Sequence, residues 1–393
     1  MEKLLFGKTM INRDLRSVVK YALEHFPAVT MIGARQVGKT TLALQLSADI
    51  GGSVFDMENP QHRLMLEDPM TVLSELSSEL VVIDEAQRME ELFPVLRVLI
   101  DQNRRSGRFL LLGSASPDLR QQSAESLAGR NQTLVLHPLT IKEVGSANKD
   151  KLWIRGGFPL SFTAGSGLIS MEWRHAYLKD LVERDLRLLG FDLPPERMRR
   201  FMMMLAHLHG QLWNASQLAR SLGIGTTTTG RYLDVMQQTL LVKRLSPYYV
   251  NLGKRLTKSP KVYLADSGLL HSLLNIESKL DLLAHPVAGA SWEGFVFQQL
   301  DAVLPVNWEI SFWRTAAGAE IDLLILRNNK PFIAIECKVN ATNPRPSRGY
   351  YQACDDLNIE NRWVIYPGEK RLPLPHDTEV ISMSDALARM NDF

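Results

Sequence analysis

The segment 33–40, Gly-Ala-Arg-Gln-Val-Gly-Lys-Thr, constrains the fold more than any other part of the chain. It follows an apolar run, 28–32, and precedes the segment 41–46, which has helical character. A strand, a glycine-rich loop and a helix in this order form a P-loop, in which backbone N–H groups and the helix N-terminus face the phosphates of a nucleotide. The sequence therefore predicts an α/β domain that binds ATP at this loop.

The loop also indicates which residues would contact ATP and its metal ion. We expect Lys39 to reach the β and γ phosphates and the Thr40 hydroxyl to hold Mg²⁺. The predicted ATP-binding residues are Gly33, Ala34, Arg35, Gln36, Val37, Gly38, Lys39, Thr40 and Thr41. An ordinary glycine-rich turn before a helix is the alternative, and the confirming context of strand and helix argues against it.

Two further apolar runs end in polar residues. The run 80–84 ends in Asp84 and is followed by Glu85, which is unusual for a buried strand without a use for the charge. We expect Asp84 to lie behind the Mg²⁺ shell and Glu85 to polarise the attacking water. The run 108–114 ends in Ser114, which would sense the γ-phosphate. A solvated acidic turn, and a plain Gly-Ser turn, are the respective alternatives.

Positive charge is concentrated between residues 196 and 265. This segment holds eleven basic and two acidic residues, a net charge of +9, whereas the whole chain carries +2. A field of this sign attracts polyanions.

The basic segment has the pattern of a winged helix. Helices are predicted over 198–209, 214–222 and 226–241, the last two with helix-turn-helix spacing, and strands over 243–250 and 261–264. The candidate recognition helix carries Thr227, Thr228, Arg231 and Tyr232, and the hairpin tip carries Lys254, Arg255 and Lys258. Of these residues, the predicted DNA contacts are Thr227, Thr228, Arg231, Lys254, Arg255 and Lys258. A protein-docking module, or a solvated charged face, is the alternative.

The last third of the chain holds a second candidate active site. A helix over 292–300 precedes strands over 308–315, 321–326 and 331–339, with a hairpin turn at 328–330. Glu336 and Lys338 share one face of the last strand, and Asp322 opens the strand before it. Restriction-type nucleases collect a metal site in this way: Asp322 and Glu336 would hold Mg²⁺ and Lys338 would orient or activate water. A catalytically quiet nuclease fold that binds DNA is the alternative.

The chain resembles the AAA-type (AAA+) P-loop ATPases of bacteria and archaea that carry a C-terminal domain with a restriction-nuclease-like, PD-(D/E)xK, core. The resemblance rests on segments 33–40, 84–87, 113–114, 126–130, 156–159 and 263–268. It implies a ring-forming homo-oligomer, a hexamer, in which Arg130 reaches into a neighbour's nucleotide site as an arginine finger. Arg120 is the other candidate finger, and a surface or helix-terminal arginine is the alternative for Arg130. Glu293 and Gln352 match accessory positions of the nuclease-like core.

These predictions divide the chain into four domains: a P-loop AAA+ core at 1–136, a helical lid at 137–195, a winged helix at 196–275 and a nuclease-like domain at 276–393. The lid would contain a long charged helix over 173–189. Two cysteines exclude a disulfide framework and a cysteine-rich zinc site. The chain shows no secretory signal at 1–8 and no apolar run of membrane-spanning length, so we expect no membrane partner and a cytoplasmic location.

Three functions are consistent with this organisation. The favoured one is a DNA-dependent ATPase that uses ATP and Mg²⁺ and acts as a ring-shaped motor or remodeller on duplex or branched DNA, with branch migration at four-way junctions as one form. The first alternative is an ATP-gated, Mg²⁺-dependent nuclease in DNA repair or defence. The second is a nucleotide-controlled signalling switch whose basic module binds a protein.

Overall fold

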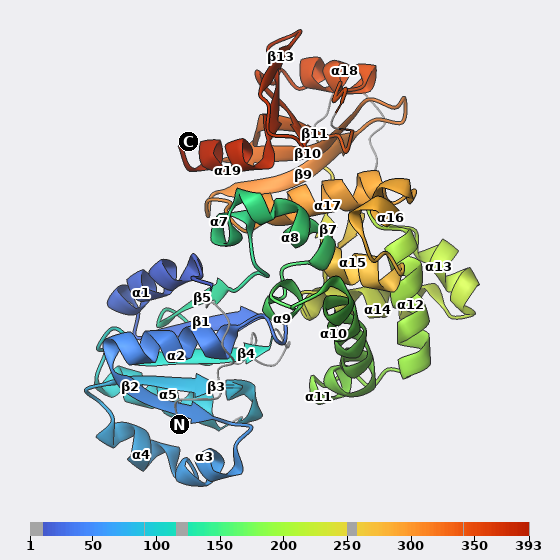
Figure 1. The fold of residues 1–393 in the computed structure, drawn as a ribbon. Helices are drawn as coiled ribbons and strands as arrows, with labels where there is room; N and C mark the ends of the chain where they lie inside the picture. Colours follow the sequence, from blue (N-terminus) through green and yellow to red (C-terminus); the bar gives the residue numbers. More distant parts are fainter. Residues whose placement is uncertain (1–10, 90, 115–124, 250–257, 341, 393) are drawn as a thin grey trace. The chain divides into compact units, whose positions relative to one another are not determined.

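The computed structural model describes residues 11–89, 91–114, 125–249, 258–340 and 342–392 (Figure 1). The chain divides into two compact units. The first comprises Met1–Leu139 with Gln238–Leu240, and the second comprises Thr140–Gln237 with Leu241–Phe393. Every helix within the described ranges is too short or too polar to traverse a bilayer.

A five-stranded parallel sheet forms the first unit, with the strand order β2-β3-β4-β1-β5. Every residue of β1, β3 and β4 is buried, as expected for parallel strands that are near-continuous apolar runs. The strands are β1 (Ala28–Gly33), β2 (Gly52–Asp56), β3 (Leu80–Asp84), β4 (Phe109–Ser114) and β5 (Asn131–Val135). The strands predicted from the apolar runs before the P-loop, before Glu85 and before Ser114 are therefore confirmed.

Short capped helices accompany this sheet. Asn59 and Asp68 cap α3 and α4 by accepting hydrogen bonds from the backbone N–H groups of Gln61 and Thr71, and each helix has proline in its first turn. The buried face of α5 packs on β3 and β4 in one apolar core. The elements are α1 (Leu15–His25), α2 (Lys39–Ile50), α3 (Pro60–Met65), α4 (Pro69–Glu75), η1 (Ala86–Arg88) and α5 (Leu92–Gln102).

The second unit begins with helices. The helix predicted over 173–189 exists, but it starts earlier, as α10 (Gly167–Asp180), and runs through a π-helical segment, η3 (Leu181–Asp185), into α11 (Leu186–Leu188) (Figure 1). Ser166 sets its start by accepting a hydrogen bond from the N–H of Ile169. The preceding elements are α7 (Ile141–Val144), η2 (Ser146–Asn148), α8 (Lys149–Arg155) and α9 (Pro159–Phe162).

The motifs at 156–159 and 263–268 contact one another in the buried interior of the second unit. Asp266 caps α15 (Ser267–Leu273) through the N–H of Leu269 and also accepts the N–H of Gly157 at 2.7 Å. Gly156 has φ +77°, and a Cβ there would lie 2.1 Å from Asp266, so only glycine fits. Arg174 donates to the backbone carbonyl oxygens of Ile154 and Gly268 and so links the regions around the same two motifs. These two motifs therefore have a packing role.

Three helices and a three-stranded antiparallel sheet follow, and we call residues 195–264 the basic module. They are α12 (Pro195–His207), β6 (Gln211–Leu212), α13 (Ala215–Leu222), α14 (Thr226–Gln238), β7 (Val242–Leu245) and β8 (Lys261–Leu264), with the sheet order β6-β8-β7. Asn214 caps α13 through the N–H of Gln217, which confirms the predicted helix start. The strand predicted over 243–250 is shorter, and its continuation pairs with the C-terminal sheet through Pro247 and Phe312.

A six-stranded mixed sheet forms the C-terminal part, with the order β13-β14-β12-β11-β10-β9. β9, β10 and β11 are antiparallel, whereas β11, β12 and β14 are parallel. The hairpin between β10 and β11 turns at Asn328 and Asn329, both with positive φ. Its elements are α16 (Lys279–Ala284), α17 (Ala288–Asp301), β9 (Trp308–Arg314), β10 (Glu320–Arg327), β11 (Lys330–Cys337), α18 (Arg348–Asp356), β12 (Asn361–Tyr366), β13 (Leu372–Leu374), β14 (Thr378–Ser382) and α19 (Met383–Asp392). The protein is thus of the α/β class, with a parallel-sheet core and a separate C-terminal sheet.

Candidate functional site

The loop between β1 and α2 has the backbone geometry that a phosphate cradle requires. Gly38 is the N-cap of α2 at φ +104°, a conformation that side-chain-bearing residues rarely adopt. A Cβ at Gly33 would lie 2.9 Å from the carbonyl oxygen of Leu136, so this position also needs glycine. The loop therefore leads directly from the carboxyl end of β1 into the N-terminus of α2, where backbone N–H groups favour a phosphate.

Lys39 lies buried inside this loop. Its ammonium donates to the carbonyl oxygens of Gly33 and Ala34, each at 3.1 Å, and the residue is 5 % exposed. Burial lowers the pKa of Lys39, although the negative charges of Glu85 and Asp84 oppose the shift. The ammonium thus has neutral carbonyl oxygens as hydrogen-bond acceptors, and it lies where the phosphates of a nucleotide would bind.

Thr40 and Asp84 form the donor set for a metal ion. The Thr40 hydroxyl donates to Asp84 Oδ2 at 2.5 Å, and the N–H of Glu85 donates to Asp84 Oδ1 at 2.9 Å. Burial raises the pKa of Asp84, and the Thr40 hydrogen bond partly offsets it. One hydroxyl and one carboxylate beside a phosphate cradle fit Mg²⁺, which keeps most of its ligands as water and substrate phosphate.

Glu85 is held in an uncommon backbone conformation beside this pair. It has φ +50° and ψ +44°, the left-handed region, which is costly for a residue other than glycine. Gln87 Nε2 donates to Glu85 Oε2 at 2.5 Å, and Ser114 Oγ donates to Glu85 Oε1 at 3.4 Å. The structure therefore brings together Lys39, Thr40, Asp84, Glu85 and Ser114, as the sequence predicts.

Other loop residues lie around this centre. Arg35 is 3.6 Å from Glu58, whose carboxylate also accepts Arg88 at 2.5 Å. Val37 and Ala34 are buried, whereas Gln36 and Thr41 are exposed. None of these positions changes the prediction that the loop binds ATP.

Arg13 supports the loop, and sequence reasoning did not identify it. Its guanidinium donates to the carbonyl oxygen of Val37 at 2.9 Å and to that of His137 at 2.5 Å, and the residue is buried. Both acceptors are backbone atoms, which leave no mark in a sequence. Arg13 thus holds the loop against the segment that follows β5.

Arg130 lies at the opposite end of the strands from the P-loop. It directly precedes β5, whose first residue, Asn131, pairs with Ala28 at the start of β1, whereas the P-loop follows the end of β1. The guanidinium forms a bidentate pair with Asp101, with atom separations of 2.7 and 2.8 Å. Arg130 is therefore remote from the P-loop of its own chain. Arg120, the other candidate finger, falls outside the described residues.

The basic module exposes those predicted DNA contacts that the structure describes. Thr227, Thr228, Arg231 and Lys258 are exposed, and Lys254 and Arg255 fall outside the described residues. Tyr232, which also lies on the candidate recognition helix, is 1 % exposed and packs edge-on against Phe201, so its side chain belongs to the core. It belongs to the buried stripe of α14 with Thr229, Leu233 and Met236.

Three cations that the sequence analysis counted in the positive field are paired inside the second unit. Lys243 pairs with Asp301, and Arg244 with Asp234. Lys261 lies buried against carboxylates of the C-terminal part. The exposed positive field is accordingly smaller than the formal charge of the segment.

The predicted nuclease residues are brought together in part. Lys338 donates to Glu336 Oε1 at 2.7 Å, and the N–H of Cys337 donates to Asp322 Oδ2 at 2.9 Å. Burial, followed by the charge of Asp322, raises the pKa of Glu336. Glu293 instead accepts Lys261 and the hydroxyl of Tyr263. Gln352 is exposed and donates to Asp356 within α18, so it does not join the group.

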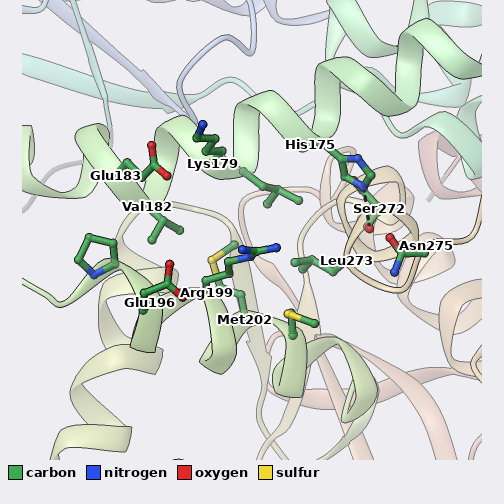
Figure 2. A pocket seen from close by; sticks show the side chains of 13 residues that line it. His175, Lys179, Val182, Glu183, Glu196, Arg199, Met202, Ser272, Leu273 and Asn275 are labelled. Carbon is green, nitrogen blue, oxygen red and sulfur yellow. Dashed lines mark hydrogen bonds between the residues drawn. The ribbon is translucent and has the colours of Figure 1, made fainter.

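The second unit also contains a pocket of about 480 Å³ (Figure 2). Its apolar lining comes from α10, η3, α12 and α15, including Val182, Met202 and Leu273, and Lys179 and Arg199 lie among its charged residues. The Ser272 hydroxyl is buried without a hydrogen-bond partner among the described residues. The volume is typical of small-molecule sites, and no local sequence pattern reveals the pocket because its walls come from helices that are distant in the sequence.

Three protein families match consecutive parts of the chain. The family described as AAA domain matches residues 25–145, and two domains of unknown function, DUF8612 and DUF4143, match residues 147–280 and 288–386. The uncharacterized protein Rv2008c of Mycobacterium tuberculosis is 47 % identical over 375 residues, which cover 95 % of this chain and 84 % of the relative. The uncharacterized protein Mb2031c of Mycobacterium bovis matches to the same extent.

The solved structures that match part of the chain include a Walker-type ATPase and a branch migration motor, each with a TM-score below 0.5. The Walker-type ATPase PABY2304 of Pyrococcus abyssi is 16 % identical with a TM-score of 0.47, covering 67 % of this chain and 96 % of its own. The RuvB Holliday junction branch migration motor of Thermotoga maritima is 19 % identical with a TM-score of 0.28, covering 60 % and 90 %.

Proposed function

The chain belongs to one family with the uncharacterized mycobacterial proteins Rv2008c and Mb2031c, and we propose that its AAA domain hydrolyses ATP at the P-loop in a cycle coupled to DNA. The observation that carries the hydrolysis proposal is the position of Glu85. Its carboxylate, held by Gln87 and Ser114, lies beside the Thr40–Asp84 pair at the carboxyl edge of the sheet. A base next to the phosphate cradle is what attack by water requires.

In this proposal the chain binds the triphosphate through the loop backbone and Lys39. The Lys39 ammonium exchanges two neutral carbonyl oxygens for phosphate oxygens, a charge-assisted hydrogen bond that is stronger than those it replaces. Thr40 and Asp84 would hold Mg²⁺, which neutralises charge on the phosphates.

Glu85 would accept the proton of the attacking water, and Ser114 would keep the carboxylate in place. The left-handed backbone at Glu85 supports this role, because strained residues persist where surrounding contacts fix them and are concentrated at functional sites. Arg130 would act on the nucleotide of a neighbouring subunit, since it lies at the opposite end of the strands from its own P-loop. This part of the proposal requires an oligomer, and a hexameric ring is the form that we propose.

We propose that the basic module is a winged helix that contacts DNA. The order α12-β6-α13-α14-β7-β8, with the antiparallel sheet at its end, supports this fold. Exposed arginines on α12 (Arg197, Arg199 and Arg200) and the exposed Thr227, Thr228 and Arg231 on α14 support the contact. Such residues hold phosphates and base edges when a recognition helix enters the major groove.

The experiment that tests the coupling is ATP turnover measured with no DNA and with single-stranded, duplex and four-way-junction DNA. We expect DNA to stimulate turnover and Arg231→Ala to reduce the stimulation while leaving DNA-free turnover unchanged. Lys330→Ala, which removes an exposed cation outside the module, is the matched control. Equal turnover with every DNA and no complex at low salt would contradict the DNA proposal and favour a module that binds protein.

We also propose a nuclease-like fold for the C-terminal part. A helix, three antiparallel strands, a helix and a strand parallel to the third one follow in order as α17, β9, β10, β11, α18 and β12. The fold would bring Mg²⁺ to Asp322 and Glu336. The residues around this site do not fit the metal, because lysine side chains already lie beside both carboxylates, so no cleavage step is proposed.

A further inference from the structure

A buried lysine lies in the carboxylate cluster of the C-terminal part. Lys261, the first residue of β8, is 3 % exposed. Its Nζ is 2.9 Å from Glu293 Oε1, 2.9 Å from Glu320 Oε1 and 3.9 Å from Asp322 Oδ1. We call Glu293, Glu320 and Asp322, together with Glu336, the acidic cluster. The Lys261 ammonium therefore has two direct carboxylate partners and a third carboxylate close by.

Other groups complete the surroundings of this ammonium. The Tyr263 hydroxyl donates to Glu293 Oε1, the same oxygen that Lys261 contacts. The ring of Phe312 lies 5.3 Å from Nζ, within cation–π range. Burial disfavours the ammonium, but the charges of Glu293, Asp322 and Glu320 outweigh it and raise the pKa of Lys261. Lys261 is thus held as a cation.

A nuclease-like fold implies a divalent metal at Asp322, and the observed groups do not fit one. Glu293 and Asp322 face the Lys261 ammonium, and Glu336 is bound by Lys338. Among the residues that the structure describes, no three histidine, cysteine or acidic side chains are arranged to hold a metal ion. A dication beside Lys261 would meet a buried like charge, which is unfavourable at low dielectric constant.

We propose that Lys261 is the resident cation of the acidic cluster and takes the place of a divalent metal there. The C-terminal part is then a nuclease-like fold that is neutralised from within. Because Lys261 belongs to β8, the same contact joins the sheet of the basic module to α17 and β10. This inference concerns a site separate from the P-loop and does not depend on ATP hydrolysis.

Manganese binding to the nucleotide-free full-length chain tests the proposal, with electron paramagnetic resonance of free Mn²⁺ as the readout. We expect the wild-type chain and Asp322→Asn to give the same Mn²⁺ titration, since the cluster takes up no Mn²⁺ in either. Lys261→Met removes the ammonium and keeps an apolar stem. We expect it to gain one Mn²⁺ per chain, and Lys261→Met with Asp322→Asn to lose that ion again.

Lys243→Met is the matched control, because Lys243, on the neighbouring strand β7, also pairs with a carboxylate, that of Asp301 in α17, but outside the acidic cluster. It should gain no Mn²⁺ site. The proposal is overturned if the wild-type chain binds an Mn²⁺ ion that Asp322→Asn abolishes. A folded Lys261→Met chain without a new Mn²⁺ site overturns it as well. If Lys261→Met does not fold, the Mn²⁺ titrations of the wild-type chain and Asp322→Asn still test whether Asp322 holds a metal ion.

Discussion

The P-loop and the acidic cluster each bury a lysine near carboxylates, but the two ammonium groups have opposite partners. Lys39 donates to two neutral backbone carbonyls, and burial lowers its pKa. Lys261 contacts Glu293 and Glu320 directly, and these charges raise its pKa. A buried cation without an anionic partner is prepared to take a phosphate, whereas one already neutralised excludes further cations.

Backbone strain separates the two sites in the same way. Glu85 has left-handed backbone angles at the end of β3, whereas Glu293 lies within the regular helix α17 and Asp322 within the strand β10. Strain of this kind persists only where surrounding contacts hold it, and it is concentrated at catalytic and ligand sites. The comparison favours chemistry at the P-loop and a structural ion pair at the acidic cluster.

Lys39→Ala should have the largest effect on function. We expect ATP binding to fall below detection, because the phosphates lose their charged hydrogen-bond donor, while the melting temperature changes little because only bonds to neutral carbonyls are lost. Titration with a fluorescent ATP analogue measures the first effect and thermal unfolding the second. Lys20→Ala, which removes a surface ion pair with Asp49, is the control. Tight ATP binding by folded Lys39→Ala would show that the phosphates do not need the Lys39 ammonium.

Glu85→Gln should retain ATP binding and lose turnover by about 10³-fold, the range for removal of a general base. Single-turnover hydrolysis and nucleotide titration separate the two quantities. Glu75→Gln, a change at an exposed carboxylate at the end of α4, should leave both unchanged. Full turnover in Glu85→Gln would remove Glu85 from the mechanism.

Arg130→Ala should slow hydrolysis by roughly 10³-fold with ATP binding intact, the lower end for an arginine finger. Because Arg130 is remote from its own P-loop, a role in hydrolysis would require the nucleotide of a neighbouring chain. An equal mixture of Arg130→Ala and Lys39→Ala chains should therefore recover part of the activity that each lacks alone. Arg97→Ala, at an exposed arginine of α5, is the control. A mixture as inactive as its components would argue against a finger acting between subunits.

The P-loop could be predicted because its signal is local. Gly33, Gly38 and Lys39 have fixed spacing within eight residues, and the flanking strand and helix follow from apolar patterns. The positive φ of Glu85 could not be predicted, since glutamate has no preference for it. Arg13 was missed because its partners are carbonyl oxygens 24 and 124 residues away.

The basic module contains two buried side chains that differ in how far they could be predicted. Tyr232 was placed on the candidate recognition helix with Thr227, Thr228 and Arg231, and helical spacing puts it with Thr229, Leu233 and Met236 on the buried face of α14. Its burial was therefore predictable. Lys261 was counted among the eleven basic residues of the positive field, and its carboxylate partners come from α17 and β10, beyond the module. No local pattern reveals such a pair, because it depends on how β8 packs.

Lys261→Met should destabilise the fold by about 3 kcal/mol, the lower range for removing one partner of a buried ion pair. Lys243→Met removes a more exposed pair with Asp301 and should cost less than about 1 kcal/mol. Chemical unfolding followed by tryptophan fluorescence measures both changes. Equal losses for the two variants would mean that the acidic cluster does not depend on its lysine more than an ordinary surface pair does.

The smallest expected effect separates two lysines that are three residues apart. Lys258 is exposed near the predicted hairpin tip, whereas Lys261 is buried in the acidic cluster. If the tip holds phosphate, Lys258→Ala should reduce the slope of log affinity for duplex DNA against log salt by about 0.9. Changing Lys254 and Arg255 as well, which lie outside the described residues, should reduce it further. Lys261→Met should leave the slope unchanged, because a buried cation with carboxylate partners releases no counterion from DNA. A slope that Lys258→Ala does not alter would mean that this side chain does not touch phosphate.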